Sequence, residues 1–199
     1  MYAKRTVDVL YAKEMILEGR VAAFPTGTSY GLAVNALSGH ALQRLRNIKK
    51  RPAEKTFTVY MSDALWDTYL LLTPGEEAVL HRYGNAALTL LVRPQESLAH
   101  LAQDGLIGLR VIDHPVMKHL AETTALPLTA TSANISGQDP CYTPDEIEAA
   151  FPGKDGTTYD LSLACILDGG ALKPGRVSTI AYYRNGSMDV MRQGSLIFS

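Results

Sequence analysis

Two polar segments, far apart in the chain, carry the side chains with the most evident chemistry. The segment KKRPAEK at 49–55 offers clustered cations, and TATSANISG at 129–137 offers small hydroxyl and amide groups on a turn. Arginine forks across two phosphate oxygens, whereas lysine acts as a movable point charge, so the first segment suits a polyanion. Neither GxGxxG nor GxxxxGKS/T occurs in the chain. The two segments therefore predict two halves of a nucleotide-phosphate site that lacks a glycine-rich phosphate loop.

Each segment also has a purely structural interpretation. Cations in the last turn of a helix are favoured by the helix dipole in any protein, and Ser and Asn commonly hydrogen-bond their own backbone in turns. Two details favour a functional role for the cations, since Pro52 fixes the chain direction directly after Arg51 and Lys55 adds another cation. In the second segment, Ser132 and Asn134 are separated by one residue and are able to face the same ligand.

The charge balance restricts the classes of partner. The chain has 19 Lys and Arg against 20 Asp and Glu, for a net charge of -1, which argues against a strong overall field for nucleic acid or an anionic membrane. Any basic surface must therefore be local. Residues 44–55 concentrate six cations and a single acid. This segment keeps open the alternative of a protein that binds structured RNA by its phosphate backbone.

Composition indicates a globular protein of one domain, spanning 1–199, because 46% of the residues are hydrophobic and 20% are charged. Lys13 and Glu14 interrupt the first apolar pattern, which is unlike a signal peptide, and no apolar run approaches the ~18 residues that span a bilayer. Cys141 and Cys165 have neither redox nor metal spacing, and the five histidines are scattered. We therefore expect a cytoplasmic protein with no membrane contact and no protein-bound metal.

Helical and strand-like periodicities alternate along the chain. Ser38 is a plausible helix cap, Pro52 cannot continue a helix, and Thr73 and Thr143 each open a capping box with proline in the first turn. The alternation predicts an α/β fold with a twisted, mixed, open sheet flanked by helices. Helices are expected at 7–17, 38–50, 62–71, 115–123, and from 73 and 143 onward. Strands are expected at 21–24, 56–61, 87–92, 107–112, 128–131, 164–167, 177–182 and 188–191.

The loop after the first predicted strand, FPTGTSYGL at 24–32, is rich in hydroxyls flanked by glycines. It falls at the C-terminal end of a strand, where open α/β sheets commonly bind ligands, although a solvated Pro-Gly turn is the plainer interpretation. Near the C-terminus, GRVSTI at 175–180 and MRQG at 191–194 add a hydroxyl pair and another arginine. Each of these short motifs carries little information by itself.

Taken in order, PTGTSYGL, the Lys-x-Arg of IKKRPAEK, GLRVIDHP, TSANISG, VSTI and MRQG resemble the YrdC/TsaC family, the threonylcarbamoyl-AMP synthases of tRNA modification. The resemblance extends over roughly residues 21–194. It implies a YrdC-like fold and a nucleotidyltransferase that joins L-threonine, bicarbonate and ATP into threonylcarbamoyl-AMP and pyrophosphate, for N6-threonylcarbamoyladenosine formation in tRNA. Such chemistry needs positioning and charge neutralisation but no protein nucleophile.

The resemblance also implies roles for individual residues. Lys49 and Arg51 would be catalytic, at an exposed helix end, and would face Ser132 and Asn134 across the nucleotide. Mg²⁺ is expected with the triphosphate, held by phosphate oxygens and water. The ATP site would comprise Lys49, Arg51, Lys55, Ser132, Asn134, Thr143 and Arg192. The threonine site would comprise Thr26, Tyr60, Arg110 and Ser178.

The implied partners are the proteins that transfer the threonylcarbamoyl group onward, together with a direct contact to tRNA or double-stranded RNA. Two alternatives stay open. One is a protein of the same fold that binds RNA without synthase activity, and the other is a related transferase for another amino acid. The chain departs from the family pattern at Gly27, where the family usually has an acid, and at Tyr60, where it often has His.

Overall fold

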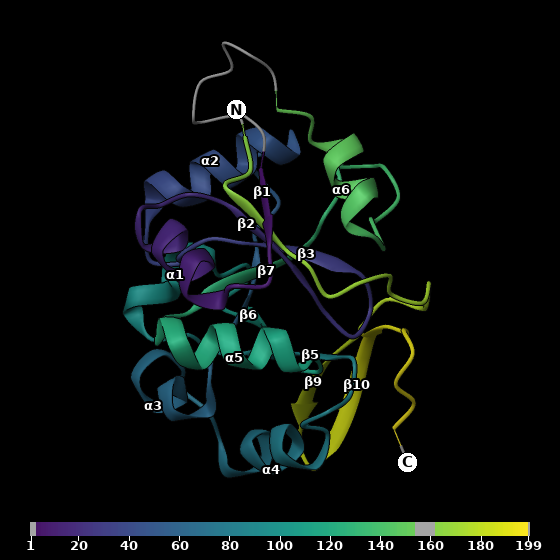
Figure 1. The fold of residues 1–199 in the computed structure, drawn as a ribbon. Coiled ribbons are helices and arrows are strands. Elements are labelled where there is room, and N and C mark those ends of the chain that lie inside the picture. Colours follow the sequence, from purple (N-terminus) through teal and green to yellow (C-terminus); the bar gives the residue numbers. More distant parts are fainter. Residues whose placement is uncertain (1–2, 154–161, 199) are drawn as a thin grey trace.

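The computed structural model describes residues 3–153 and 162–198 (Figure 1). Within these residues, ten strands form one sheet in the order β1-β8-β2-β3-β7-β4-β6-β5-β9-β10, with both parallel and antiparallel pairs. The mixed α/β architecture predicted from the sequence is therefore confirmed. The strands are β1 (Lys4–Thr6), β2 (Ala22–Pro25), β3 (Tyr30–Ala33), β4 (Thr58–Tyr60), β5 (Leu88–Val92), β6 (Ile107–Arg110), β7 (Leu128–Ser132), β8 (Cys165–Leu167), β9 (Thr179–Arg184) and β10 (Ser187–Arg192). The helices are α1 (Val9–Leu17), α2 (Gly39–Lys49), α3 (Trp66–Tyr69), α4 (Pro74–Arg82), α5 (Pro115–Thr124) and α6 (Pro144–Ala150), with 3-10 turns η1 (Asp63–Leu65) and η2 (Glu96–Leu101).

Local capping signals set the helix boundaries near the predicted positions. The Ser38 side chain caps α2 by accepting a backbone amide at 3.2 Å. Lys50 ends this helix in the left-handed conformation, with φ of 49°, and Pro52 follows. Thr73 and Thr143 form complete capping boxes at α4 and α6. These local interactions fix where the cations at the end of α2 meet the sheet.

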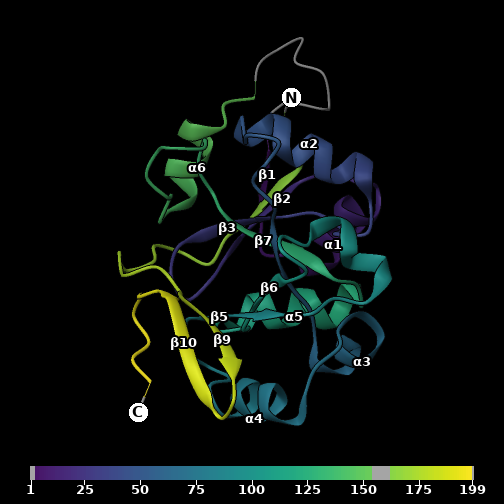
Figure 2. The same cartoon turned by 180° about the vertical axis from the view of Figure 1, so that it is seen from behind.

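Helices cover both faces of the sheet. Helices α1 and α5 lie side by side on the face turned toward the viewer in Figure 1, and α2 lies on the opposite face, which is in front in Figure 2. In β2, Ala22 and Phe24 join the apolar cluster of α1 and α5, whereas Ala23 joins the cluster that contains α2, as the alternation of a strand requires. Every residue of β2, β3 and β6 is buried, which is typical of strands covered on both faces.

Three segments differ from the sequence-based expectations. Segment 24–32, expected to be a loop, contains β3, which pairs with β2 as an antiparallel hairpin. The short polar strand β1 pairs with β8 in parallel, a long-range pairing that no local pattern reveals. The helix expected at 62–71 is instead the 3-10 turn η1 followed by the short α3, because Leu70 leaves the helix to form an isolated bridge with Pro94.

The lengths of the described helices show whether any of them could span a membrane. Among the described helices α2 is the longest, with 11 residues, whereas crossing a bilayer takes about 20 apolar residues. Across 3–153 and 162–198, no helix combines the length and the apolar character that a membrane span requires.

Candidate functional site

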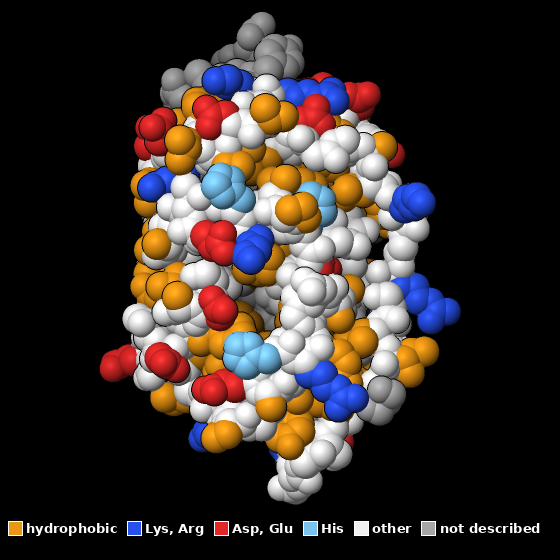
Figure 3. All heavy atoms as spheres, turned by 60° about the horizontal axis from the view of Figure 1, so that its bottom comes forward, with side chains coloured by type: hydrophobic (Ala, Val, Ile, Leu, Met, Phe, Trp, Pro, Cys, Tyr) orange, Lys and Arg blue, Asp and Glu red, His pale blue; other side chains and the backbone are white. Residues whose placement is uncertain are grey.

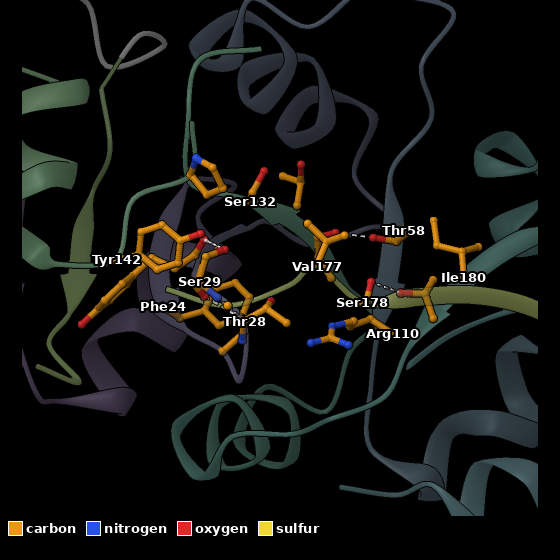
Figure 4. Close-up of a pocket in the computed structure, with 18 of the residues that line it drawn as sticks. Phe24, Thr28, Ser29, Thr58, Arg110, Ser132, Tyr142, Val177, Ser178 and Ile180 are labelled. Atoms are coloured by element: carbon orange, nitrogen blue, oxygen red, sulfur yellow. Dashed lines mark hydrogen bonds between the residues drawn. The ribbon is translucent and has the colours of Figure 1, made fainter. Parts of the chain in front are cut away.

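A cavity of about 340 Å³ opens between the central strands and the segment that precedes β9 (Figure 4). Its volume lies within the range of small-molecule sites. Three arginines line it, Arg51, Arg110 and Arg192, and no carboxylate does so within the described residues. A concave site that is lined by positively charged side chains and by no acid favours an anionic ligand. The remaining lining is rich in hydroxyl side chains, which offer hydrogen bonds without charge.

The connection between β2 and β3 supplies part of that hydroxyl lining. Thr26 is buried, and its Oγ1 donates to the Ser29 carbonyl at 2.7 Å. The same oxygen accepts the backbone amides of Thr28 and Ser29 at 3.2 and 3.3 Å. These bonds fix the turn, so the side chains of Thr28 and Ser29 border the cavity from a defined backbone (Figure 4). Thr26 also lines the cavity, with its hydroxyl engaged in the turn.

Arg110 ends strand β6 and borders the cavity although its side chain is only 7% exposed. Its Nη2 donates to Asp113 Oδ2 at 2.5 Å, and its Nη1 donates to the Leu88 carbonyl at 3.2 Å. Burial lowers the pKa of the guanidinium, and the carboxylate of Asp113 opposes this shift. Figure 4 shows the arginine between Thr28 and Ser178. Arg110 is thus a fixed, charge-compensated donor at the cavity wall.

Ser178 and Arg192 form a connected pair on the side of β9 and β10. Arg192 donates from Nη2 to the Ser178 carbonyl at 2.8 Å and to Ser178 Oγ at 3.1 Å. Ser178 Oγ also lies 3.0 Å from Thr89 Oγ1. Partial burial and the nearby charge of Arg110 lower the pKa of Arg192. Two guanidinium groups that repel each other across a cavity would both be stabilised by an anion between them.

Arg51 lies directly after the end of α2, and its side chain lines the same cavity as Arg110 and Arg192. Its Nη2 donates to the Thr56 carbonyl at 2.5 Å, and its guanidinium lies 4.8 Å from the centre of the Phe57 ring. Burial and the neighbouring Arg46 lower the pKa of Arg51. Within the described residues Arg51 has no carboxylate partner, so its charge is available to a ligand.

The expectation that Lys49 occupies an exposed helix end is wrong. Its side chain is 1% exposed, and Nζ donates to the Ser132 carbonyl at 2.5 Å, to the Asn134 carbonyl at 2.9 Å and to Asn134 Oδ1 at 3.0 Å. The backbone amide of Ser136 also donates to the Lys49 carbonyl at 2.8 Å. The turn after β7 therefore closes over the end of α2. Lys49 and Asn134 touch each other and do not face each other across the cavity.

Asn134 is part of this turn and does not line the cavity. Its Oδ1 accepts from Ser132 Oγ at 2.6 Å as well as from Lys49, and its Nδ2 donates to the Gln138 carbonyl at 2.5 Å. Ser132 does line the cavity. Of the predicted Ser-x-Asn pair, the serine is placed to contact a ligand, and the asparagine holds the serine in place.

Three other predicted site residues also lie away from the cavity lining. Lys55 is exposed. Thr143 caps α6, where its Oγ1 accepts the Glu146 amide at 3.1 Å. Tyr60 is fully buried, with its ring centre 5.2 Å from that of Phe24, and its hydroxyl has no hydrogen-bond partner among the described residues. Burial raises the pKa of Tyr60 well above its usual value, so it stays a neutral phenol packed in the core.

The cavity also contains residues that the sequence did not single out. Thr58 lines it and donates to the Ala130 carbonyl. The alternation of strand β4 could have indicated this position, because neighbouring residues in a strand point to opposite faces and Val59 is buried. Tyr142 lines the cavity directly before the capping residue of α6, and no sequence signal marks it. Asp113 lies outside the lining but forms an ion pair with Arg110. The sequence signal for this pair, an aspartate three residues after the arginine in GLRVIDHP, was missed.

In the basic segment 44–55, Lys50 and Lys55 are exposed, whereas the other cations are engaged by the protein itself or line the cavity. Arg44 and Arg46 donate to the Gly19 and Pro52 carbonyls at 2.6 and 2.7 Å, and Lys49 is buried. On another face, formed around α3, α4 and α5, acidic, basic and histidine side chains are interspersed among apolar ones (Figure 3). The described charges thus favour a small anionic ligand in the cavity over a shape-matched RNA helix.

Comparison with protein families gives one match over most of the chain. The family model Sua5/YciO/YrdC, described as "Telomere recombination", matches residues 14–194. The Threonylcarbamoyl-AMP synthase of Pyrococcus abyssi is 31% identical over 189 residues, which cover 93% of this chain and 53% of the relative. The Threonylcarbamoyl-AMP synthase of Haemophilus influenzae is 32% identical over 146 residues, which cover 69% of this chain and 79% of the relative. The chain spans about half the length of the Pyrococcus relative.

Solved structures show the same fold. The crystal structure of P. abyssi Sua5 complexed with L-threonine superposes with a TM-score of 0.81 and 28% identity, covering 97% of this chain and 57% of that one. E. coli YciO superposes with a TM-score of 0.77 at 21% identity, covering 97% of this chain and 94% of that one. The second likeness concerns the fold alone.

Proposed function

Because the chain belongs to the Sua5/YciO/YrdC family, we propose that it is a threonylcarbamoyl-AMP synthase, an enzyme that joins L-threonine, bicarbonate and ATP and releases pyrophosphate. Relatives that exceed 30% identity carry that name, and a similar solved structure holds L-threonine. The product serves the formation of N6-threonylcarbamoyladenosine in tRNA. We place the reaction in the cytoplasm, where ATP and tRNA are both present.

One observation carries the proposal: three arginines and no carboxylate line a cavity of small-molecule size. The reaction brings together a triphosphate, an amino-acid carboxylate and a carbamate, all of them anions. Fixed guanidinium groups suit such a site because they fork across carboxylate and phosphate oxygens. A hydroxyl-rich lining without an acid or base pair suits a reaction in which the enzyme positions its substrates.

The nucleotide side of the cavity is assigned to Arg51, Arg192 and Ser132. The carbamate oxygen of the threonine adduct attacks the α-phosphorus, the bond to the bridging oxygen breaks, and pyrophosphate leaves with the electron pair. Charge grows on the phosphate oxygens during this step, so uncompensated guanidinium groups in a partly buried site stabilise the transition state more than the ground state. Lys49 and Asn134 contribute by holding the turn that carries Ser132.

The threonine side is assigned to Arg110, Ser178 and the turn 26–29. Arg110 receives the carboxylate of the amino acid, which matches its fork of N–H donors. Hydroxyls of the turn and Ser178 lie beside it and offer partners for the amino and hydroxyl groups of threonine. The tyrosine at position 60 takes no part in this assignment because it is buried in the core.

Mg²⁺ enters as part of the substrate, MgATP. Within the described residues no group of three or more His, Cys, Asp or Glu is arranged to hold a metal ion, and the cavity lining is cationic. Phosphate oxygens and water therefore supply the ligands of the ion. The protein's own residues bind and orient the phosphates.

Pyrophosphate release measures the proposed reaction directly. The purified protein is incubated with MgATP, L-threonine and bicarbonate, and each substrate is left out in turn. We expect release only when all three are present, and a product that hydrolyses to threonine, carbon dioxide and AMP. Release that continues without threonine or without bicarbonate would contradict the proposal, and faster release with another amino acid would favour a related transferase.

A further inference from the structure

Asp113 joins two walls of the cavity that are far apart in the sequence. Its Oδ2 accepts from Arg110 Nη2 at 2.5 Å, and its Oδ1 accepts the backbone amide of Gly27 at 3.0 Å. The Asp113 side chain is 4% exposed and does not line the cavity. One carboxylate therefore holds a cavity arginine and the hydroxyl-bearing turn in a single arrangement without reaching the ligand itself.

Gly27 makes this contact feasible because it leaves room for the carboxylate. A Cβ atom added at Gly27 would lie 2.5 Å from Asp113 Oδ2 and 2.6 Å from Asp113 Cγ, distances that van der Waals radii do not permit. The need for glycine is one of space, since the residue does not have a positive φ. Any side chain at position 27 would displace the carboxylate from Arg110, from the Gly27 amide, or from both.

The ion pair also divides the three cavity arginines into two kinds. Arg110 has a carboxylate partner, so the net charge of that wall is close to zero. Arg51 and Arg192 are bonded to carbonyl and hydroxyl oxygens, with no acidic partner in the described part of the chain. A compensated guanidinium still presents N–H donors to a singly charged carboxylate, whereas uncompensated ones suit the higher charge of phosphates.

From this geometry we propose that Asp113 is a positioning residue for the amino-acid substrate. It orients Arg110 toward the α-carboxylate and fixes the position of the 26–29 turn relative to Arg110. It also keeps the net charge of this wall too low to compete for phosphate. This inference rests on the proposed function, because it assigns threonine to this end of the cavity. It predicts that loss of the contact weakens threonine binding and leaves ATP binding in place.

Two substitutions break the contact from opposite sides. Asp113→Asn keeps the shape of the side chain but removes its charge and replaces one of its two acceptor oxygens with an NH2 donor, so Arg110 and the Gly27 amide no longer both have an acceptor. Gly27→Ala keeps both charges and forces the carboxylate away. We expect each variant to raise the KM for threonine about tenfold or more and to change the KM for ATP by less than about twofold. The double variant should add little to the larger single effect, because both act on one contact.

Matched controls separate this effect from general damage. Asp67→Asn changes an exposed aspartate, and Gly39→Ala adds a methyl group that would meet no described atom within 4 Å beyond its chain neighbours and the backbone of its own helix. Both controls should keep the parent KM values, and thermal melting verifies that all variants are folded. If Asp113→Asn fails to fold because Arg110 is left buried without its partner, Gly27→Ala carries the test. Equal rises in both KM values, or an unchanged KM for threonine in a folded variant, would overturn the inference.

Hydrogen exchange tests the contact independently of activity. The Gly27 amide belongs to an exposed residue, yet its bond to Asp113 should slow its exchange. Asp113→Ala should speed that exchange about tenfold or more, relative to unaffected core amides. An equal rate in both proteins would overturn the contact itself. A wild-type protein that releases no pyrophosphate would overturn the proposed function and the substrate role of Asp113 together, whereas the exchange result would still stand.

Discussion

Lys49 is the residue whose place in the structure differs most from the role that its sequence context suggests. A buried ammonium is costly unless its protons meet acceptors, and Lys49 donates to the Ser132 carbonyl and to both oxygens of Asn134. It therefore acts on the cavity through the turn after β7, and Arg51 is the cation of the Lys-x-Arg motif that reaches the ligand space.

Lys49→Met removes the ammonium and keeps the length of the side chain. Three buried oxygens then lose a donor, so we expect the free energy of unfolding to fall by about 2–4 kcal/mol, with a loss of activity because Ser132 is no longer held. Urea denaturation measures the first quantity. Lys50→Met, at the exposed neighbouring position, should change stability by less than about 0.5 kcal/mol. Equal stabilities of the two variants would contradict a structural role for Lys49.

The same variant gives a pH-dependent prediction. Burial and the nearby charge of Arg51 lower the pKa of Lys49 from 10.5 to about 7, while its oxygen acceptors oppose this shift. Above about pH 7 the unfolded chain keeps the proton and the folded chain releases it, so the stability of the parent relative to Lys49→Met should rise with pH, by at most about 1.4 kcal/mol per unit. Below that pH the difference should be constant. A flat difference from about pH 6 to 9 would mean that the acceptors keep Lys49 charged.

At the scale of the elements, the sequence predicts those helix boundaries that depend on interactions between residues close together in the chain. The caps at Ser38, Thr73 and Thr143 and the end of α2 before Pro52 depend on neighbours within a few residues, and all are found. Strand pairing depends on distant partners, so β3 looked like a turn and β1 was overlooked. The burial of Lys49 was missed for the same reason, because its three acceptors come from a turn more than eighty positions away.

The β2–β3 hairpin depends on the glycine of β3. A Cβ atom at Gly31 would lie 2.9 Å from Phe24 Cζ and 3.2 Å from the Thr131 carbonyl oxygen, so the ring of Phe24 packs directly over the strand. Gly31→Ala should overpack this site and lower the free energy of unfolding by about 1–3 kcal/mol. A Cβ atom at Gly39 would meet open space, so Gly39→Ala should leave the free energy of unfolding unchanged or raise it by about 0.4–1 kcal/mol. Chemical denaturation of both variants decides the point, and equal stabilities would show that Phe24 moves freely.

At the scale of the whole molecule, the cavity is assembled from strands across most of the sheet. Its lining comes from β2 and β3, from β4, β6 and β7 at the centre, and from the β9 and β10 side. A ligand that bridges these strands must stabilise the folded chain, since it binds the native arrangement and not the unfolded one. The two kinds of arginine also predict that ATP and threonine stabilise the protein through different residues.

Arg51→Met tests this division on the intact protein. In the parent, saturating MgATP and saturating threonine should each raise the melting temperature, and a ligand at about 100 times its Kd contributes about 2.7 kcal/mol. Arg51→Met should lose most of the MgATP shift, because an uncompensated guanidinium is removed, and should keep the threonine shift, because Arg110 and Asp113 are untouched. Arg184→Met, at the exposed end of β9, should keep both. An undiminished MgATP shift in Arg51→Met would place the phosphates elsewhere, and a loss of both shifts would mean that one anion site serves both substrates.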